Sequence, residues 1–189
     1  MAQWRNTQTQ WGVIARVLHG VIALLIITLF VVGLAMGEIG NIQDKIFVYA
    51  MHKSFGLLVL ALILVRILWR LTNKAPADLA DIPKPMQLAA HAGHFGLYAL
   101  MLVVPLTGWL AHSRTGFTSH WFGQENLPVL PTIVAKAESR EVMHQAGELH
   151  ELAAWAIAAL VAVHVGAALY HHFIRKDGTL LRMFGRLKG

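Results

Sequence analysis

Four histidines, His19, His52, His150 and His164, lie within or at the edges of long apolar runs. An imidazole in the hydrocarbon region of a bilayer costs free energy without a partner, so a membrane histidine indicates a functional site. Imidazole nitrogens bind transition metals, and a haem with two axial histidines needs two such rings on facing helices. The four histidines are therefore candidate haem or metal ligands.

The spacing of two of these histidines predicts that they share one helix face. His150 and His164 are 14 residues apart in one apolar segment. At 100° and 1.5 Å per residue, this spacing corresponds to about 40° of azimuth and about 21 Å along the axis. His150 then lies near one membrane surface and His164 nearer the other.

Depth along the helices predicts a partner for each. His19 is eight residues from the start of the first apolar segment, and His164 is nine from the end of the last. His52 is six residues into the second segment, near the level of His150. We therefore expect His19 to pair with His164 and His52 with His150, and two stacked haems would form an electron path across the membrane.

The elements that position these residues are four apolar segments, each about 20 residues or longer, the length that a membrane crossing needs. The segments cover approximately residues 11–36, 46–71, 91–111 and 148–173. Only 14% of the residues are charged, whereas soluble domains have about 25%. We predict an all-α integral membrane four-helix bundle, with residues 1–189 forming a single transmembrane domain. The first segment is interpreted as a retained helix, because its apolar core is too long for a cleaved signal peptide.

The distribution of Lys and Arg predicts the orientation. With the N-terminus inside, 11 of the 16 basic residues lie on the inner side. The other five are Lys45, Lys53, Arg114, Lys136 and Arg140. The positive-inside rule therefore predicts a multi-pass protein with both termini in the cytoplasm. The five outer cations would attract an anion.

Composition excludes several kinds of cofactor and partner. The chain contains no cysteine, which excludes disulfides, thiolate-bound iron–sulfur clusters and covalently attached c-type haem. The net charge of +6 comes from residues that flank apolar segments, so it does not predict a nucleic-acid partner. Zinc and copper remain alternatives, but the cores of the four apolar segments lack the acidic residues expected of a metal transporter.

Four stretches of the sequence resemble the bacterial cytochrome b561 family. They are "LHG" around His19, "MHKSFGLLVLALILVRILWR" from Met51, "HAGHFGLYALMLVVPLTGW" from His91 and "VHVGAALYHHFIRKDGTLLRM" from Val163. The resemblance extends over nearly the whole chain. It implies two haem b groups with His19, His52, His150 and His164 as axial ligands, the same four that depth and spacing predict.

The resemblance also implies an oxidoreductase activity. One activity in this family is the oxidation of periplasmic superoxide to O₂, with electrons passing from an outer to an inner haem and then to ubiquinone. Other members act as electron-transfer cytochromes, so an anchor subunit for a separate dehydrogenase or hydrogenase is an alternative. A haem-free metal-binding or transport protein is the alternative from a different class.

Three further residues are candidates for contacts with quinone or with haem propionates. His171 is seven residues, or two turns, beyond His164 and could hydrogen-bond a quinone carbonyl and deliver a proton. Arg66 could pair with a propionate or a quinone headgroup, although snorkelling towards lipid headgroups also explains it. His94, near the start of the third segment, could line the same site or act as an alternative ligand. An interfacial position would also explain His171.

Two connecting regions complete the sequence-based predictions. Residues 73–90 contain three prolines and are predicted to form an inner linker. Residues 112–147 form the longest outer stretch, which either binds the electron donor or covers the bundle. Asp177 is interpreted as a solvated loop residue that pairs with Arg175 or Lys176.

Overall fold

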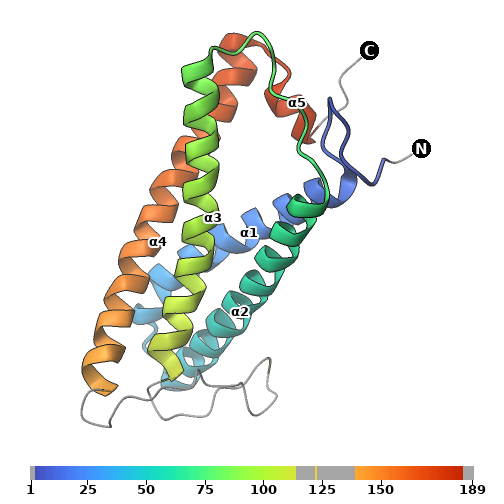
Figure 1. Cartoon of the computed structure of the whole chain (residues 1–189). Helices are drawn as coiled ribbons and strands as arrows, with labels where there is room; N and C mark the ends of the chain where they lie inside the picture. The colour runs from blue at the N-terminus through green and yellow to red at the C-terminus, as the bar shows by residue number, and fades with distance from the viewer. Residues whose placement is uncertain (1–2, 114–121, 123–138, 185–189) are drawn as a thin grey trace. The chain divides into compact units, whose positions relative to one another are not determined.

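All the regular structure that the computed structural model describes, over residues 3–113, 122 and 139–184, is helical (Figure 1). The elements are α1 (Val13–Ala35), the 3₁₀ turn η1 (Met36–Glu38), α2 (Ile42–Thr72), α3 (Lys84–Ser113), α4 (Ser139–Tyr170), the π-helical turn η2 (His171–Arg175) and α5 (Thr179–Phe184). The predicted all-α fold class is confirmed.

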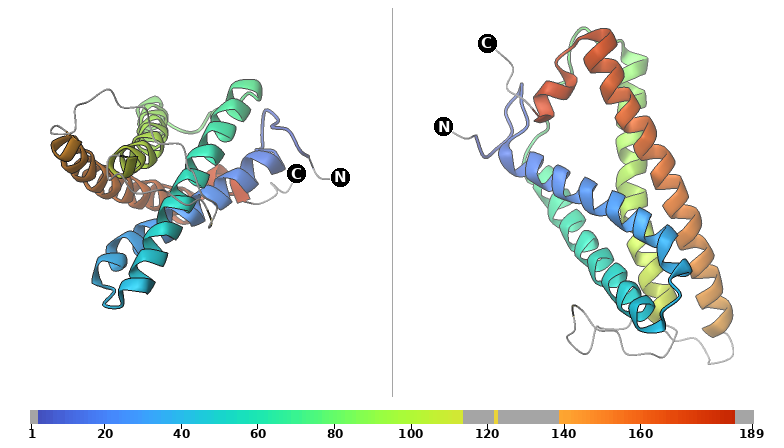
Figure 2. Two further views of the ribbon diagram at one scale, coloured as in Figure 1. Left: turned by 90° about the horizontal axis from the view of Figure 1, so that it is seen from below. Right: turned by 180° about the vertical axis from the view of Figure 1, so that it is seen from behind.

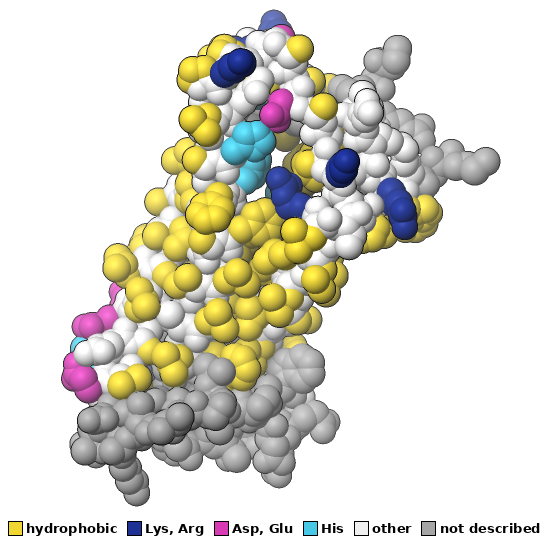
Figure 3. Space-filling model, in the orientation of Figure 1, with side chains coloured by type: hydrophobic (Ala, Val, Ile, Leu, Met, Phe, Trp, Pro, Cys, Tyr) yellow, Lys and Arg dark blue, Asp and Glu magenta, His cyan; other side chains and the backbone are white. Residues whose placement is uncertain are grey.

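Four helical stretches among the described residues are long and apolar enough to cross a membrane. They are Val13–Glu38, Ile42–Thr72, Lys84–His112 and Glu141–Arg175. Large apolar side chains point outwards from them, and Figure 3 shows hydrophobic side chains covering the long helices on the face drawn. Lipid tails solvate such side chains as well as a protein core does. The chain is therefore an integral membrane protein with four spanning helices.

The third helix begins at Lys84, earlier than the predicted boundary near residue 91. The carbonyl of Pro83 accepts hydrogen bonds from the backbone N–H groups of Met86 and Gln87, at 2.9 and 3.1 Å. Pro85 fits the first helical turn, because its missing N–H would have no partner within the helix there. Part of the predicted linker is therefore helix.

The fourth helix also begins earlier than predicted, at Ser139 instead of near residue 148. Residues 139–147 of the predicted outer stretch therefore belong to this helix. At the other end, α4 continues from Tyr170 into the π-helical turn η2, which ends at Arg175. The outer stretch of residues 114–138 lies outside the described residues, except for Phe122.

The chain folds into two compact units, and each unit contains part of all four long helices. Unit 1 consists of Met1–Ala23, Leu62–Ala99 and Ala159–Gly189, and unit 2 of Leu24–Ala61 and Leu100–Ala158. Every long helix thus crosses from one unit to the other within its own length. The single-domain organisation stays a prediction.

In unit 1, the guanidinium of Arg182 connects α5 with two backbone segments. Its Nε donates to the carbonyl of Thr9 at 2.7 Å, and its Nη2 donates to the carbonyls of Ala77 at 2.7 Å and Gln8 at 3.4 Å. Arg182 is only 9% exposed, and burial lowers the pKa of its guanidinium. The two views in Figure 2 show α5 beside the N-terminal segment. One buried cation therefore holds three parts of the chain together.

In unit 2, the helices pack through small and aromatic side chains. Ala146 and Ala153 of α4 are 5% and 4% exposed, and such small residues allow helices to approach closely. Phe30 of α1 packs edge to face against Trp155 of α4, with ring centroids 5.2 Å apart. The hydroxyl of the fully buried Ser54 donates to the carbonyl of Ala50 within α2. The polar group is thereby satisfied inside the helix.

We predict that Arg182→Ala lowers the stability of the protein by about 2 kcal/mol or more, because three carbonyls lose a charged donor. The midpoint of thermal unfolding should fall by about 4 °C or more, measured by far-ultraviolet circular dichroism in detergent micelles. Arg16→Ala is the control, because Arg16 makes an exposed hydrogen bond to the carbonyl of Phe184. Equal midpoints for the two variants would contradict this role of Arg182.

Candidate functional site

Unit 2 brings together His52 of α2 and His150 of α4. Their ring centroids are 6.3 Å apart and their planes are inclined by 83°. The Nδ1 of His52 is buried and has no hydrogen-bond partner among the described residues. The predicted outer pair is therefore adjacent in the structure, with a buried ring nitrogen free to bind another group.

A backbone carbonyl fixes the ring of His150. Nδ1 of His150 lies 2.8 Å from the carbonyl oxygen of Val104 in α3. A carbonyl can only accept a hydrogen bond, so Nδ1 carries the hydrogen and Nε2 of the neutral ring keeps its lone pair. Ligating histidines usually donate their other N–H to a carboxylate or carbonyl in this way.

Gly108 of α3 provides the space for this ring. A Cβ at position 108 would lie 3.0 Å from both Cε1 and Nδ1 of His150. That separation is shorter than ordinary van der Waals contact, so a side chain here would displace the imidazole. Across the pair, a Cβ at Gly33 of α1 would lie 3.4 Å from Cε1 of His52, which is an ordinary contact.

Unit 1 brings together His19 of α1 and His164 of α4. Their ring centroids are 6.2 Å apart, with an interplanar angle of 53°. The Nδ1 of His19 is buried and has no hydrogen-bond partner among the described residues. Phe184 of α5 packs against the ring of His19 at 5.8 Å. The predicted inner pair is also adjacent, and α5 covers one side of it.

A third histidine in unit 1 makes the inner pair different from the outer one. The ring of His94 in α3 lies 5.3 Å from that of His164, closer than the ring of His19. An iron bound by one nitrogen of each ring at about 2 Å would separate the two centroids by about 6 Å. The pairs His19–His164 and His52–His150 have this separation, whereas His94 is too close to His164. Two histidine pairs therefore fit bis-histidine haem.

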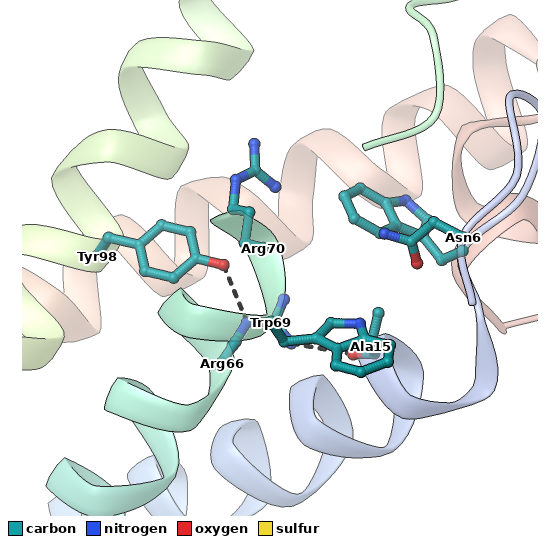
Figure 4. A pocket seen from close by; sticks show the side chains of 7 residues that line it. Asn6, Ala15, Arg66, Trp69, Arg70 and Tyr98 are labelled. Atoms are coloured by element: carbon teal, nitrogen blue, oxygen red, sulfur yellow. Dashed lines mark hydrogen bonds between the residues drawn. The ribbon is translucent and has the colours of Figure 1, made fainter. Parts of the chain in front are cut away.

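Arg66 lines a small pocket in unit 1 (Figure 4). Other residues of the pocket, such as Ala15 and Tyr98, are close in sequence to His19 and His94. Nη1 of Arg66 donates to the carbonyl of Ala15 in α1 at 3.0 Å, and Nε donates to the hydroxyl of Tyr98 in α3 at 3.1 Å. Arg66 therefore connects three helices instead of extending to the lipid headgroups. Trp69 places at the same pocket a buried indole N–H that has no hydrogen-bond partner in the part of the chain that the structure describes.

Arg70 completes this basic, aromatic pocket. Its guanidinium lies 5.8 Å from the ring centroids of both Trp11 and Tyr98. Figure 3 shows histidine and basic side chains around a hollow in this part of unit 1. The pocket combines guanidinium donors with aromatic walls, a chemistry that suits carboxylates or the carbonyls of a flat ring.

His171, in the turn η2 that follows α4, contacts the carboxylate of Asp177. Nδ1 of His171 lies 2.5 Å from Oδ2 of Asp177, and their side chains are 12% and 3% exposed. Asp177 pairs with Arg175 as predicted, with Nε 3.3 Å from Oδ2. The prediction that its carboxylate is solvated is wrong, because the chain turns at Lys176 and brings the carboxylate back to His171 in η2. Burial raises the pKa of Asp177, but hydrogen bonds from His171 and Thr179 outweigh it and lower the pKa to about 2.

Several other predicted residues lie in less informative places. Nε2 of His91 lies 3.1 Å from Oδ2 of Asp78 in an exposed contact, of the kind that contributes little to stability. Nζ of Lys45 donates to the carbonyl of Gly37 at the start of α2. Arg114 and Lys136 of the predicted outer surface lie outside the described residues.

Comparison with known proteins decides the family. Residues 10–186 match the family model described as prokaryotic cytochrome b561. The chain belongs to this family. It is therefore a bacterial membrane electron-transfer protein with b-type haem as its cofactor, as the sequence resemblance implied.

Three relatives illustrate the range of the family. The chain is 33% identical to "Cytochrome b561 homolog 2" of Escherichia coli (strain K12) over 183 residues, which cover 96% of this chain and 94% of the relative. It is 31% identical to "Cytochrome b561 homolog 1" of the same organism over 137 residues, 72% and 74% of the two chains. It is 31% identical to "Probable superoxide oxidase CybB" of Yersinia pestis over 139 residues, 73% and 75% of the two chains.

Sequence reasoning did not find three features of these sites. They are the carbonyl of Val104 that holds His150, the space at Gly108, and the contact of Asp177 with His171. Gly108 follows Thr107 near the end of an apolar helix, where a glycine weakens the helix and therefore suggests a packing role. A carbonyl partner has no sequence signal, because every residue has a carbonyl.

We predict that Gly108→Ala lowers the haem content of the protein or shifts its absorption bands, because the new methyl group displaces His150. The measurement is the ratio of haem to polypeptide by the pyridine haemochrome method, together with the reduced-minus-oxidised spectrum. Gly93→Ala in the same helix is the matched control, because a Cβ there has no neighbour within 4 Å among the described residues other than the backbone of its own helix. A normal haem ratio and spectrum in Gly108→Ala would refute the role of this glycine.

Proposed function

We propose that the protein carries two haem b groups, one in each unit. His52 and His150 hold one haem, and His19 and His164 hold the other. The support is that two histidine pairs on different helices have the centroid separation that an iron between the rings requires. Each pair offers two imidazoles, the number that a six-coordinate haem uses, whereas zinc sites use three or four protein ligands.

We further propose that the protein is a superoxide:ubiquinone oxidoreductase of the inner membrane, with both termini in the cytoplasm. The balanced reaction is 2 O₂•⁻ + Q + 2 H⁺ → 2 O₂ + QH₂, where Q is ubiquinone. The haems supply reversible one-electron chemistry between the two substrates. The name of the Yersinia pestis relative and the separation of His150 and His164 along α4 support this assignment.

The protein residues act by positioning and by proton transfer. Val104 and Gly108 set the ring orientation of His150, and Phe184 packs against the ring of His19. The quinone site lies in unit 1, where Arg66 and His171 supply a guanidinium and an imidazole. We assign His94 to the same site, because its ring contacts that of His164. These groups would bind a quinone carbonyl or a propionate and supply the protons that quinone reduction consumes.

We predict that single His→Ala variants separate the two haem sites. His19→Ala and His164→Ala should each lower the ratio from about two to about one haem per polypeptide by removing the same haem, and His52→Ala and His150→Ala should remove the other. The identity of the lost haem is read from low-temperature absorption spectra and redox titration. His94→Ala should keep both haems. If His94→Ala lost a haem and His19→Ala kept both, the inner pairing would be wrong.

The reaction itself is tested by supplying superoxide enzymatically to the purified protein in the presence of ubiquinone-1. We expect one ubiquinol to form for about two superoxide ions, because superoxide gives one electron and quinone accepts two. Superoxide dismutase and the His52→Ala variant should both suppress this formation. Quinol formation that superoxide dismutase does not affect would reject superoxide as the donor. Stable copurification of a soluble dehydrogenase or hydrogenase would instead favour the anchor-subunit function.

A further inference from the structure

A buried histidine–carboxylate pair lies beyond the haem-binding residues, at the end of α4. Nδ1 of His171 contacts Oδ2 of Asp177 at 2.5 Å, and the carboxylate is almost completely buried. Arg175 also donates to Oδ2, at 3.3 Å, and the backbone N–H of Thr179 donates to Oδ1 at 3.0 Å. Both oxygens of the carboxylate are therefore satisfied.

The backbone adopts an unfavourable conformation to form this pair. Lys176 has φ 54° and ψ 34°, in the left-handed region that non-glycine residues rarely occupy. Its N–H and that of Asp177 both donate to the carbonyl of His171. The π-helical turn and this reversal of the chain together bring Asp177 into contact with His171, six residues earlier. Strained backbone of this kind is concentrated at functional sites.

The hydrogen bond to Asp177 determines which nitrogen of the His171 ring is left to bind another molecule. The carboxylate of Asp177 is the acceptor, so Nδ1 of His171 carries a hydrogen and Nε2 is the nitrogen left to face another molecule. Arg175 is anchored separately, because its Nη2 donates to the carbonyl of Asp81 at 3.0 Å. The ring of Tyr170 contacts that of His171 at its edge, 5.9 Å away. The imidazole is thus held in one orientation.

We propose that Asp177 is a positioning residue for proton delivery to the quinone. It holds His171 through Nδ1 and stabilises the imidazolium, so that Nε2–H transfers its proton to a quinone oxygen. Two electrons from two superoxide ions and two protons convert Q into QH₂, and the imidazole regains each proton from water. An acid held and oriented by a buried carboxylate is an efficient proton donor. This inference rests on the proposed function, because it takes quinone as the acceptor.

The chain contains a matched control for this role. His91 and Asp78 form a second histidine–aspartate pair, with a 3.1 Å contact between Nε2 and Oδ2, but their side chains are 57% and 53% exposed. Solvent can replace either partner there, so removing the carboxylate should have little effect. Asp78→Asn therefore tests the loss of an aspartate without the loss of a buried, oriented imidazole.

The experiment follows the oxidation of pre-reduced haem by ubiquinone-1 in a stopped-flow spectrometer, without superoxide. For Asp177→Asn we expect the limiting rate at saturating quinone to fall by about 10²-fold, with little change in the quinone concentration for half-saturation. The solvent isotope effect should rise. Asp177→Glu should recover part of the rate, and Asp78→Asn should match the wild type. His171→Gln should be as slow as Asp177→Asn, and the double variant no slower, because the two residues act as a unit.

Two measurements are independent of turnover. Haem content and absorption spectrum should be unchanged in Asp177→Asn, because neither residue touches the haem ligands. Nitrogen-15 NMR of histidine-labelled protein should show the Nδ1–H form of His171 in the wild type. The asparagine amide would donate to Nδ1 and shift the ring towards the Nε2–H form. The His171→Gln spectrum identifies the resonance.

The outcomes separate this inference from the function on which it rests. If ubiquinone-1 does not oxidise the reduced wild-type haems, the proposed acceptor is wrong. If the wild type reacts and Asp177→Asn reacts at the same rate, the positioning role is wrong. If Asp177→Asn does not fold, His171→Gln decides the question, because an unchanged limiting rate in that variant would overturn the proposal.

Discussion

A polar side chain inside a bilayer must find its partner within the protein, and this constraint governs the arrangement of the helices around α4. His150 and His164 project from α4 at two levels, and each meets a histidine from another helix. The other elements pack so that these rings are oriented and covered. Gly108 leaves space for the ring of His150 beside the α3 backbone, and Phe184 packs against the ring of His19. The helix packing therefore serves the histidine pairs.

The same constraint explains the polar chemistry of unit 1. Arg66 donates to a helix carbonyl and to a tyrosine hydroxyl, and Arg182 donates to three backbone carbonyls. A guanidinium has several donors in a fixed plane and can join segments that are distant in sequence. Arginines thereby connect helices and termini where a soluble protein would use an apolar core. This packing leaves His171 and Asp177 as a separate buried pair suited to proton transfer.

The two histidine pairs differ in their surroundings, and the difference agrees with the division of labour that we propose. In unit 2, the Nδ1–H of His150 is fixed by a carbonyl, an arrangement that suits simple electron transfer. In unit 1, His94 lies beside His164, and two arginines line a nearby pocket. A site that must bind a neutral quinone and deliver protons needs these extra donors, whereas a site that accepts one electron from a small anion does not.

The sequence by itself determined the spanning helices and the histidines that meet. Apolar length and helical geometry are properties of local sequence, so the four spans and the depth match of His52 with His150 followed from counting residues. The sequence did not determine where α3 begins, because Pro85 is compatible both with a break in the helix and with its first turn. Only the tertiary structure decided that Asp177 returns to His171, since a left-handed residue at Lys176 reverses the chain. Contacts with backbone carbonyls and reversals of the chain depend on packing in three dimensions, which residue types and spacing do not encode.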